Sequence, residues 1–585
     1  MYKRANAIGV NRIFLTLFML FFTCQCSAKT ESNEGGNIQE KLSLPLIDYT
    51  SIDSYWTLKS ISDSGYFKVG RRYVHAPRVE WVPVDGVSWY KIVLLQHGEI
   101  LGVTEAGMPP VYAEKGWDKI KPGKASVAII GYGTDGQRAA ISRLFPFYVA
   151  PNFDKKVSAE RKRPYLDAAY RTFNALYEFR LPPQTPAPDS GPGSRIKHPV
   201  VLTAMGSPNG WVSLSWPNLH DWCYVAMCSE LLKTADSDLK PKIISFADSV
   251  GKHIMMCRLS GEDNVYSGMI RGCVDWNGES VLAFTRPTKE EADKYRRLIE
   301  PAKCGYSGEA LVRIYEMTGD TNYLDAAEAI ANCLMRTQLP DGSWPARVDG
   351  KTGEVIGEYS TSAIAVASFM DRLNEHRPST KMVECSKRAL NWTTENPFKT
   401  FGWVLNYDDS DVLTTSVNPY IGLSNWDLFA SIKYLEHQPG NNWQKIAKEQ
   451  LRWNDNHFVF YGDDPLLAYD PYYPTCGEQG NPGSFTSEKS CWLPMDFHTA
   501  NWGLALLSAY KMSGDEEYLE KAKAAGNALT QYQLDTGATI TWMQDKKTGL
   551  STALAGNNQE AHGLWPAAWA LSAAFWAKLE ADFGQ

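Results

Sequence analysis

The sequence predicts a multidomain α and β protein, with a small N-terminal β-sandwich followed by a closed ring of helical hairpins. Three observations point to this fold class. Short strand-like runs separated by turn residues fill positions 76–151, long amphipathic helices begin near Arg163, and one segment of 19 residues occurs twice in the helical region. The 585 residues exceed one ordinary domain, so at least two domains are expected.

Residues 1–26 are expected to be a secretory signal peptide. Lys3, Arg4 and Arg12 give a positive start, the run Ile13–Phe22 is apolar, and small residues follow it. A single N-terminal anchor helix is the alternative, although the apolar run is short for a bilayer span.

The end of this segment, Thr23-Cys24-Gln25-Cys26, resembles a loose version of a bacterial lipoprotein signal. The resemblance implies lipidation at Cys26, with Cys24 as the competing position, because Gln25 departs from the usual small residue. Residues 27–75 would then be a polar tether and lead-in. The protein is expected to be exported and lipid-anchored in a bacterial outer membrane or periplasm, or otherwise secreted.

Charge and cysteine content exclude several other classes. A net charge of −7 without a Lys/Arg-rich run argues against nucleic-acid binding. No second apolar run is long enough to span a membrane, so membrane contact is expected only through the lipid. The cysteines form no CxxC pair and no Cys/His zinc spacing. Calcium could bind at Asp408–Asp409 or Asp463–Asp464, but acidic loops are usually just solvated, and no metal or cofactor is required.

Positions 76–151 alternate between strand-like runs and turns. The runs are followed by turn signals such as Asp85-Gly86 and Gly133–Gly136, which is typical of a small β-sandwich. A tryptophan in an early strand, Trp81, and a Trp89-Tyr90 pair that opens the next strand resemble fibronectin type III and immunoglobulin-like modules. No chemistry is assigned to this part, because such modules usually support a neighbouring domain.

The helical region, positions 160–585, opens with an amphipathic stretch from Pro164 to Phe179, with proline at the favoured first helical position. Its strongest feature is an internal repeat. The segment Tyr306–Leu324 matches Asn501–Leu519 at a constant offset of 195 residues, and both contain a Gly-Asp turn. The repeat unit is therefore an antiparallel helical hairpin.

Looser copies of the hairpin begin at Asp221, Ser360, Asn425 and His562. About six such hairpins can close into a ring in which each covers the apolar face of its neighbour, whereas an open solenoid is the structural alternative.

The repeat, together with Gln338-Leu-Pro-Asp-Gly-Ser-Trp-Pro345, resembles the (α/α)6-toroid superfamily of glycoside hydrolases and polysaccharide lyases. The resemblance covers roughly Arg163 to the C-terminus and implies a carbohydrate-processing enzyme. It is poorly specific for the reaction, because the superfamily also includes epimerases and terpene cyclases. The DxDD signature of one cyclase branch is absent from this sequence.

Polar and aromatic residues gather where the predicted inner helices begin, and in such toroids these positions line a shared cleft. Taken alone, Asn218, Asp221 and Asp427 are ordinary helix caps. The set recurs at equivalent places of the repeat and predicts a substrate site. The residues expected to bind substrate are Trp222, Glu309, Tyr359, Trp426, Asp427, Asn501, Trp502, Glu560, His562 and Trp565.

Two reactions fit these residue types. A lyase that cuts beside a uronic acid needs a base, and donors for the charge that develops on the carboxylate. Tyr306, His220, His498 and Asn425 are the catalytic residues expected for it. A glycoside hydrolase needs two carboxyl groups instead. The candidates for that pair are Asp221, Glu309, Glu358, Asp427, Asp496 and Glu560.

The prominence of His, Tyr and Asn favours the lyase, and Glu309 is also spaced to pair with Arg313 in its own helix. A non-catalytic surface protein that binds glycans on its tryptophans is the third possibility. In each case the expected partner is a polysaccharide, and for the lyase one that contains uronic acid.

Overall fold

The computed structural model describes residues 72–178, 203–207, 210–214, 217–272, 297–356, 360–361, 363–401, 425–464, 470–479, 492–541, 543, 546 and 566–584, apart from positions 80, 82, 143, 262 and 441. The predicted signal segment and most of the tether lie outside these residues. So do Cys26, Glu358, Tyr359, Asp408–Asp409, Glu560, His562 and Trp565.

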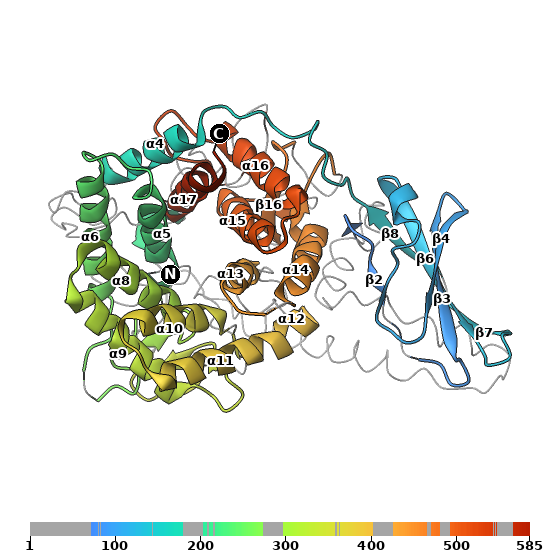
Figure 1. Cartoon of the computed structure of the whole chain (residues 1–585), viewed down its shortest axis with the longest axis horizontal. Coiled ribbons are helices and arrows are strands. Elements are labelled where there is room, and N and C mark those ends of the chain that lie inside the picture. The colour runs from blue at the N-terminus through green and yellow to red at the C-terminus, as the bar shows by residue number, and fades with distance from the viewer. Residues whose placement is uncertain are drawn as a thin grey trace, which may run out of the picture. The chain divides into compact units, whose positions relative to one another are not determined.

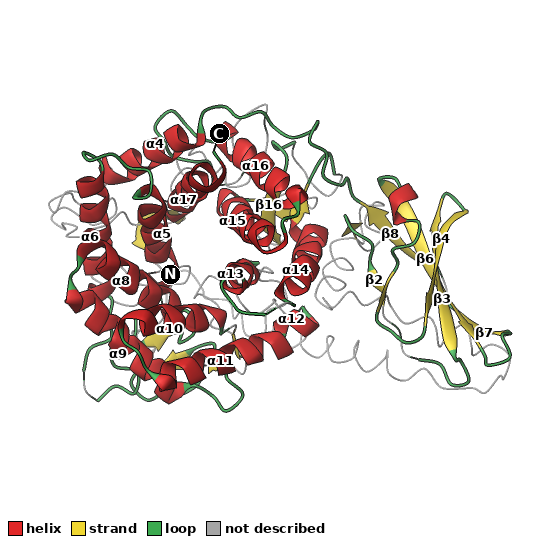
Figure 2. Cartoon of the chain, in the orientation of Figure 1, coloured by secondary structure: helices red, strands yellow, loops and turns green. Residues whose placement is uncertain are grey.

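The described chain divides into two compact units. Within the described residues, the first contains Arg78–Gly116 and Ser126–Phe145, and the second contains Arg72–Pro77, Trp117–Ala125 and the described residues from Pro146 onward. Figure 2 distinguishes the strands of the first unit from the helices that make up most of the second.

Antiparallel strands form the first unit. Strand β3 (Trp89–Gln96) pairs with β4 (Glu99–Ala106) and with β6 (Gly123–Tyr132), and β6 pairs with β7 (Arg138–Ile141). The β3–β4 turn places His97 and Gly98 at φ 52° and 82°, as a two-residue hairpin loop requires. The strand-like runs expected within positions 76–151, including the one opened by Trp89, are confirmed as strands, whereas the β-sandwich stays a prediction.

The remaining short elements are β2 (Arg78–Val79), which pairs with β5 (Val111–Tyr112), the 3-10 turn η2 (Trp117–Lys119), and β1 (Arg72–Tyr73), which pairs in parallel with β8 (Phe145–Val149). Small two- and three-stranded sheets in the second unit are β9 (Thr203–Ser207) with β10 (Gly210–Leu214), β11 (Leu298–Ile299) with β13 (Val348–Asp349), β12 (Trp344–Pro345) with β14 (Ser360–Thr361), and β15 (Val459–Phe460) with β16 (Thr475–Gln479) and β17 (Trp492–Pro494).

The second unit is built on a closed ring of inner helices. In ring order they are α5 (Trp222–Leu231), α8 (Cys304–Thr318), α10 (Ile364–His376), α13 (Trp426–Leu435), α15 (Asp496–Ser513) and α17 (Pro566–Phe583). Each packs against the next, and α17 packs against α5, so the ring is closed and the open solenoid is wrong (Figure 1). These helices start within five residues of the predicted repeat copies.

Outer helices cover the inner ring. They are α6 (Lys240–Met256), α9 (Thr321–Thr337), α11 (Thr380–Glu395), α14 (Trp443–Phe458) and α16 (Glu516–Gln531), each of which follows its inner partner in the chain, with the short α12 (Pro397–Thr400) after α11. The sixth pair differs from the expected consecutive hairpin. The outer partner of α17 is α4 (Tyr165–Glu178), the first helix of the region.

The repeated turn has the same backbone in both copies. Gly319 and Gly514 end α8 and α15 in the left-handed conformation, with φ 74° and 70°. Asp320 and Asp515 then begin α9 and α16, and the side chain of each accepts a hydrogen bond from the backbone N–H two residues later. Glycine is favoured because a side chain is strained at positive φ.

Glycines also set the spacing between neighbouring inner helices. A Cβ atom on Gly308 would lie 2.5 Å from the ring of Phe369 in α10, and one on Gly503 would lie 2.3 Å from the ring of Phe575 in α17. Each phenylalanine therefore fills the space above a glycine on the preceding inner helix. Within the described residues, none of the helices has both the length and the apolar character to cross a membrane.

Candidate active site

The first residues of four inner helices meet inside the ring. Trp222 begins α5, Tyr306 is the third residue of α8, Trp426 begins α13, and Phe497 is the second residue of α15. Their rings contact one another, so these helix starts share one location.

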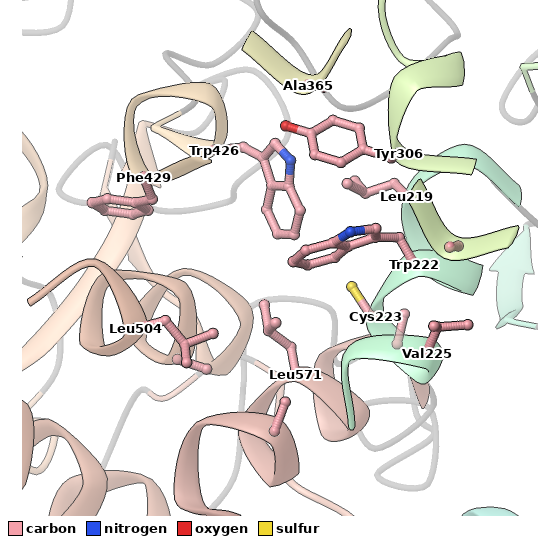
Figure 3. Close-up of a cluster of buried hydrophobic side chains, with 14 of the residues drawn as sticks. Leu219, Trp222, Cys223, Val225, Tyr306, Ala365, Trp426, Phe429, Leu504 and Leu571 are labelled. Carbon is pink, nitrogen blue, oxygen red and sulfur yellow. The ribbon is translucent and has the colours of Figure 1, made fainter. Parts of the chain in front are cut away.

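Three aromatic rings form the centre of this group. The Trp222 and Trp426 rings are 5.8 Å apart, edge to face, and Tyr306 lies 5.8 Å from Trp222 and 5.9 Å from Trp426. Figure 3 shows the three side chains converging from separate helices. Phe497 stacks on Trp426, with the ring centroids 4.7 Å apart. Edge-to-face packing fixes the rings, so their orientation does not depend on a ligand.

A carboxyl group lies against these rings. The Tyr306 hydroxyl donates a hydrogen bond of 2.9 Å to Oδ1 of Asp427, the second residue of α13. Burial raises the pKa of Asp427 to about 6, and the hydrogen bond from Tyr306 opposes the shift. A carboxyl with this pKa exchanges a proton near neutral pH, as an acid–base group must.

A lysine approaches the same rings from two helical turns further along α13. Nζ of Lys433 lies 5.0 Å from the Trp222 ring and 5.6 Å from the Trp426 ring, within cation–π range. It donates a hydrogen bond of 2.7 Å to Oδ1 of Asn501 on α15. Burial lowers the pKa of Lys433 to about 8. The ammonium is therefore held beside the aromatic group by a neutral amide.

His498 and Asn425 form a second polar group at the helix starts. Nδ1 of His498 lies 2.6 Å from Oδ1 of Asn425, and an amide oxygen only accepts, so Nδ1 carries the hydrogen. The Asn425 amide in turn donates to Asn454 and to the Gly477 carbonyl, at 3.1 and 3.3 Å. Asn425 occupies the cap position of α13 but makes no side-chain cap bond, so its side chain orients His498 instead.

His220 belongs to another buried group. It lies in the π-helical turn η3 (Pro217–Asp221), which runs directly into α5. Burial and the charge of His253 lower the pKa of His220 to about 3, so its ring stays neutral. Asp221, expected as a cap, makes no cap bond, and its Oδ2 lies 2.7 Å from Nδ1 of His253 on α6. His220 therefore lies near the buried Asp221–His253 ion pair.

The other candidates are engaged in the protein itself. Glu309 pairs with Arg313 at 2.6 Å, which confirms the spacing argument, and it is 5 % exposed. Asp496 accepts hydrogen bonds from Thr539 and from the backbone N–H of Phe497, and burial raises its pKa to about 8. Trp502 is fully buried, and its ring lies 6.0 Å from that of Tyr461.

One of the two candidate calcium positions, Asp463–Asp464, lies within the described residues. Nε of Arg72 donates to Oδ2 of Asp464 at 2.7 Å, so this carboxylate is compensated by an arginine. Among the described residues, no group of three or more His, Cys, Asp or Glu side chains could hold a metal ion.

Sequence reasoning missed Lys433 and His253. Lys433 follows Trp426 by seven residues, which is two helical turns, so the two share one helix face. A cation on the same face as an inner tryptophan was therefore a usable signal. His253 had none, because its pairing with Asp221 depends on the packing of α6 against α5.

No family model matches the sequence, and no curated protein matches it. Solved structures do resemble it. Cellobiose 2-epimerase from Spirochaeta thermophila has a TM-score of 0.47 and 13 % identity, over 71 % of this chain and 96 % of that one. A family 76 glycoside hydrolase from a bovine Bacteroides thetaiotaomicron strain has a TM-score of 0.44 and 12 % identity, over 87 % and 98 %. A polysaccharide lyase has a TM-score of 0.39 and 12 % identity, over 88 % and 64 %. Likeness at this level assigns no reaction to this chain.

Proposed function

We propose that this chain is a carbohydrate-active enzyme that cleaves a uronic-acid-containing polysaccharide by β-elimination, with Tyr306 and Asp427 as its acid–base groups. The observation that carries the proposal is their 2.9 Å hydrogen bond beside two tryptophan rings. Sugar rings have flat apolar faces that stack on such indoles, and a proton donor and acceptor lie next to them.

The proposed step balances within these groups. The Tyr306 oxygen takes the proton on the carbon next to the substrate carboxylate, while its own hydroxyl proton passes to Asp427. The electron pair of the broken C–H bond forms a carbon–carbon double bond, and the neighbouring glycosidic C–O bond breaks with its electrons on the oxygen. That oxygen leaves with a proton returned from Asp427 through Tyr306. No water is consumed, and both groups regain their starting protonation.

Other polar groups near the helix starts could stabilise the negative charge that builds up on the substrate carboxylate during this step. Lys433 and the His498–Asn425 pair are the donor types that stabilise a carboxylate as negative charge builds on it. His220, with its low pKa and buried surroundings, is less suited to a catalytic role than Tyr306. Because the step uses only side chains of this chain, we propose that a metal chelator leaves the rate unchanged.

A glycoside hydrolase is the second candidate, and one observation favours it. The raised pKa of Asp427, about 6, is that of a general acid in such enzymes. A hydrolase also needs a second carboxyl, and among the described residues Asp221, Glu309 and Asp496 are engaged with His253, Arg313 and Thr539. This engagement favours the elimination.

The deciding experiment incubates the purified protein with a panel of uronic-acid-containing and neutral polysaccharides. Near-ultraviolet absorbance and new reducing ends are followed together. Elimination raises both signals in equal amounts, because each cut creates one double bond. Reducing ends without absorbance would establish the hydrolase. Binding without either signal would establish a glycan-binding protein and end the enzyme proposal.

We also propose that the protein is exported and lipid-anchored through Cys26, with the polar segment after it as a tether. The basis is the sequence Thr23-Cys24-Gln25-Cys26 after a positive and apolar start. Cys26→Ser should abolish incorporation of a labelled fatty acid in a bacterial host, and Cys24→Ser should not. The reverse result would move the anchor to Cys24.

A further inference from the structure

We propose that Lys433, Asn501 and Trp222 form a carboxylate-binding subsite that selects anionic sugars over neutral ones. The proposal rests on the proposed function only in naming the anion as a sugar carboxylate. Inside the ring, the subsite combines an ammonium without a nearby carboxylate and two buried donors without an acceptor among the described residues.

Among the described residues, Lys433 differs from the cations around it in having no carboxylate at ion-pair distance. Arg313 pairs with Glu309 at 2.6 Å, and Lys578 pairs with Asp582 at 3.2 Å. In the described part of the chain, no carboxylate lies within 4.0 Å of Nζ of Lys433, which donates a hydrogen bond to the amide oxygen of Asn501. Charged groups in protein interiors are normally paired, so an anion is the missing partner.

Two hydrogen-bond donors beside Lys433 are also unsatisfied. Nδ2 of Asn501 and Nε1 of Trp222 are buried and have no acceptor among the described residues. Asn501 is fully buried, and Trp222 is 8 % exposed. The two unsatisfied N–H groups and the Lys433 ammonium can all donate hydrogen bonds to a ligand that has several acceptor atoms. A carboxylate is such a ligand, because it accepts through two oxygens.

The subsite lies at the level of the acid–base pair. Long side chains on a helix point back toward its N-terminus, so Lys433 returns its amine to the two indoles near the start of α13. Tyr306 contacts the same two indoles. Lys433 also retains an intermediate exposure, whereas its partners are buried, so an incoming ligand can reach it.

The ionisation of Lys433 predicts how the subsite responds to pH. The groups that face it are Glu309 and Arg313 from α8, Lys578 from α17, the Cys223 thiol from α5 and the neutral Asn501 from α15, with Arg372 of α10 facing Glu309. Burial lowers the pKa of Lys433 to about 8. Binding of an anion should therefore weaken as the pH rises through about 8, while neutral sugars should show no such change.

The test measures binding of D-glucuronate and D-glucose to the full chain by tryptophan fluorescence, since Trp222 and Trp426 line the subsite. Wild type should bind glucuronate and discriminate against glucose. Lys433→Met should weaken glucuronate binding at least about tenfold, the loss expected for one charge-assisted contact, and Lys433→Arg should retain part of it. Lys252→Met is the control, because Lys252 is 66 % exposed on α6 and pairs only with Asp248 in the described chain.

Unchanged glucuronate binding by folded Lys433→Met, or failure of wild type to prefer glucuronate, would overturn the proposal. If the variant does not fold, the wild-type pH profile decides, because affinity that is constant across pH 8 contradicts a lysine partner. The two proposals fail separately. Lysine-dependent binding without cleavage of any polysaccharide refutes the enzyme, and cleavage with lysine-independent binding refutes only the subsite.

Discussion

Tyr306 and Asp427 are joined by a 2.9 Å hydrogen bond although α10 separates their helices in the ring. The bond therefore reaches across the inside of the ring and not between neighbouring helices. Trp222 on α5 and Trp426 on α13 make a comparable contact between helices on opposite sides. The helix starts thus form one group whose members come from distant parts of the sequence.

Removing either member of the pair should abolish most of the activity without unfolding the protein. Tyr306→Phe keeps the aromatic packing and loses only the hydroxyl, and Asp427→Asn keeps the size of the side chain. Each should lower kcat by about 10²–10⁴-fold, the range for a positioned acid–base group. Steady-state kinetics and circular dichroism measure both effects. Normal turnover by Tyr306→Phe would remove it from the mechanism.

The pH dependence should identify Asp427. Its carboxyl must be ionised to accept the Tyr306 proton, and burial raises its pKa to about 6. The rate should therefore increase as the pH rises through about 6 and stay level until Lys433 loses its proton near pH 8. In a hydrolase that uses Asp427 as its acid, the rate would instead fall across this range. Rates of Asp427→Asn, where measurable, should lack this step.

The glycine–phenylalanine contacts should be sensitive to a single methyl group. Gly308→Ala and Gly503→Ala place a Cβ 2.5 and 2.3 Å from the rings of Phe369 and Phe575, so the rings must move. Each substitution should reduce the free energy of unfolding by about 1–3 kcal/mol, the usual cost of overpacking. Thermal unfolding measures this loss. The double variant Gly308→Ala/Phe369→Leu should recover part of it, and a stable Gly308→Ala would show that α8 and α10 separate easily.

The two repeated caps should contribute equally to stability. Asp320 and Asp515 share φ −78° and ψ 108° and make the same cap bond, so each alanine variant should cost about 0.5–2 kcal/mol. Ser379 precedes α11 without a side-chain cap bond and is the matched control. Chemical denaturation compares the three variants. A cost for Ser379→Ala equal to the other two would contradict the role of the cap bond.

Arg72 should be critical for the stability of the second unit. Its guanidinium is buried and donates to Asp464 and to the backbone carbonyls of Asp455, Asn456 and Val459. Arg72→Met removes the cation from a buried carboxylate and should cost about 3–5 kcal/mol.

Two variants act as controls for Arg72. Arg72→Met/Asp464→Leu should recover part of the loss, because the carboxylate is removed as well. Lys155→Met breaks an exposed ion pair with Glu520 and should cost at most about 1 kcal/mol. Equal losses for Arg72→Met and Lys155→Met in thermal unfolding would show that burial adds nothing to the pair.

The ring was predictable because its signals are local. A Gly-Asp turn between two amphipathic helices specifies a hairpin by itself, and Gly319–Asp320 and Gly514–Asp515 confirm this. The pairing of α17 with α4 was not predictable in this way. It joins two segments at opposite ends of the helical region, and no local rule connects them.

Residue types at the helix starts indicated the location of the site but not the pairing within it. Asp221 and Asn425 have the residue types of caps, yet their side chains contact His253 and His498. Trp426 begins α13 and contacts Trp222, whereas Trp502 is the seventh residue of α15 and contacts Tyr461, and residue type alone does not distinguish the two tryptophans. The partner of each of these side chains depends on tertiary contacts, which cannot be inferred from the local sequence.

The pairing of the first helix with the last has a consequence for folding. In an open array of repeats, unfolding can spread inward from either end, because each repeat depends only on its neighbours. Here α4 supports α17, and α17 completes the ring with α5, so neither end can fray without opening the ring. The residues of α4 and α17 are far apart in the sequence, so bringing them together costs much chain entropy. This contact should therefore form late in folding, after most of the ring is in place. The ring should therefore unfold in one cooperative transition, and truncation at α17 should destabilise every hairpin.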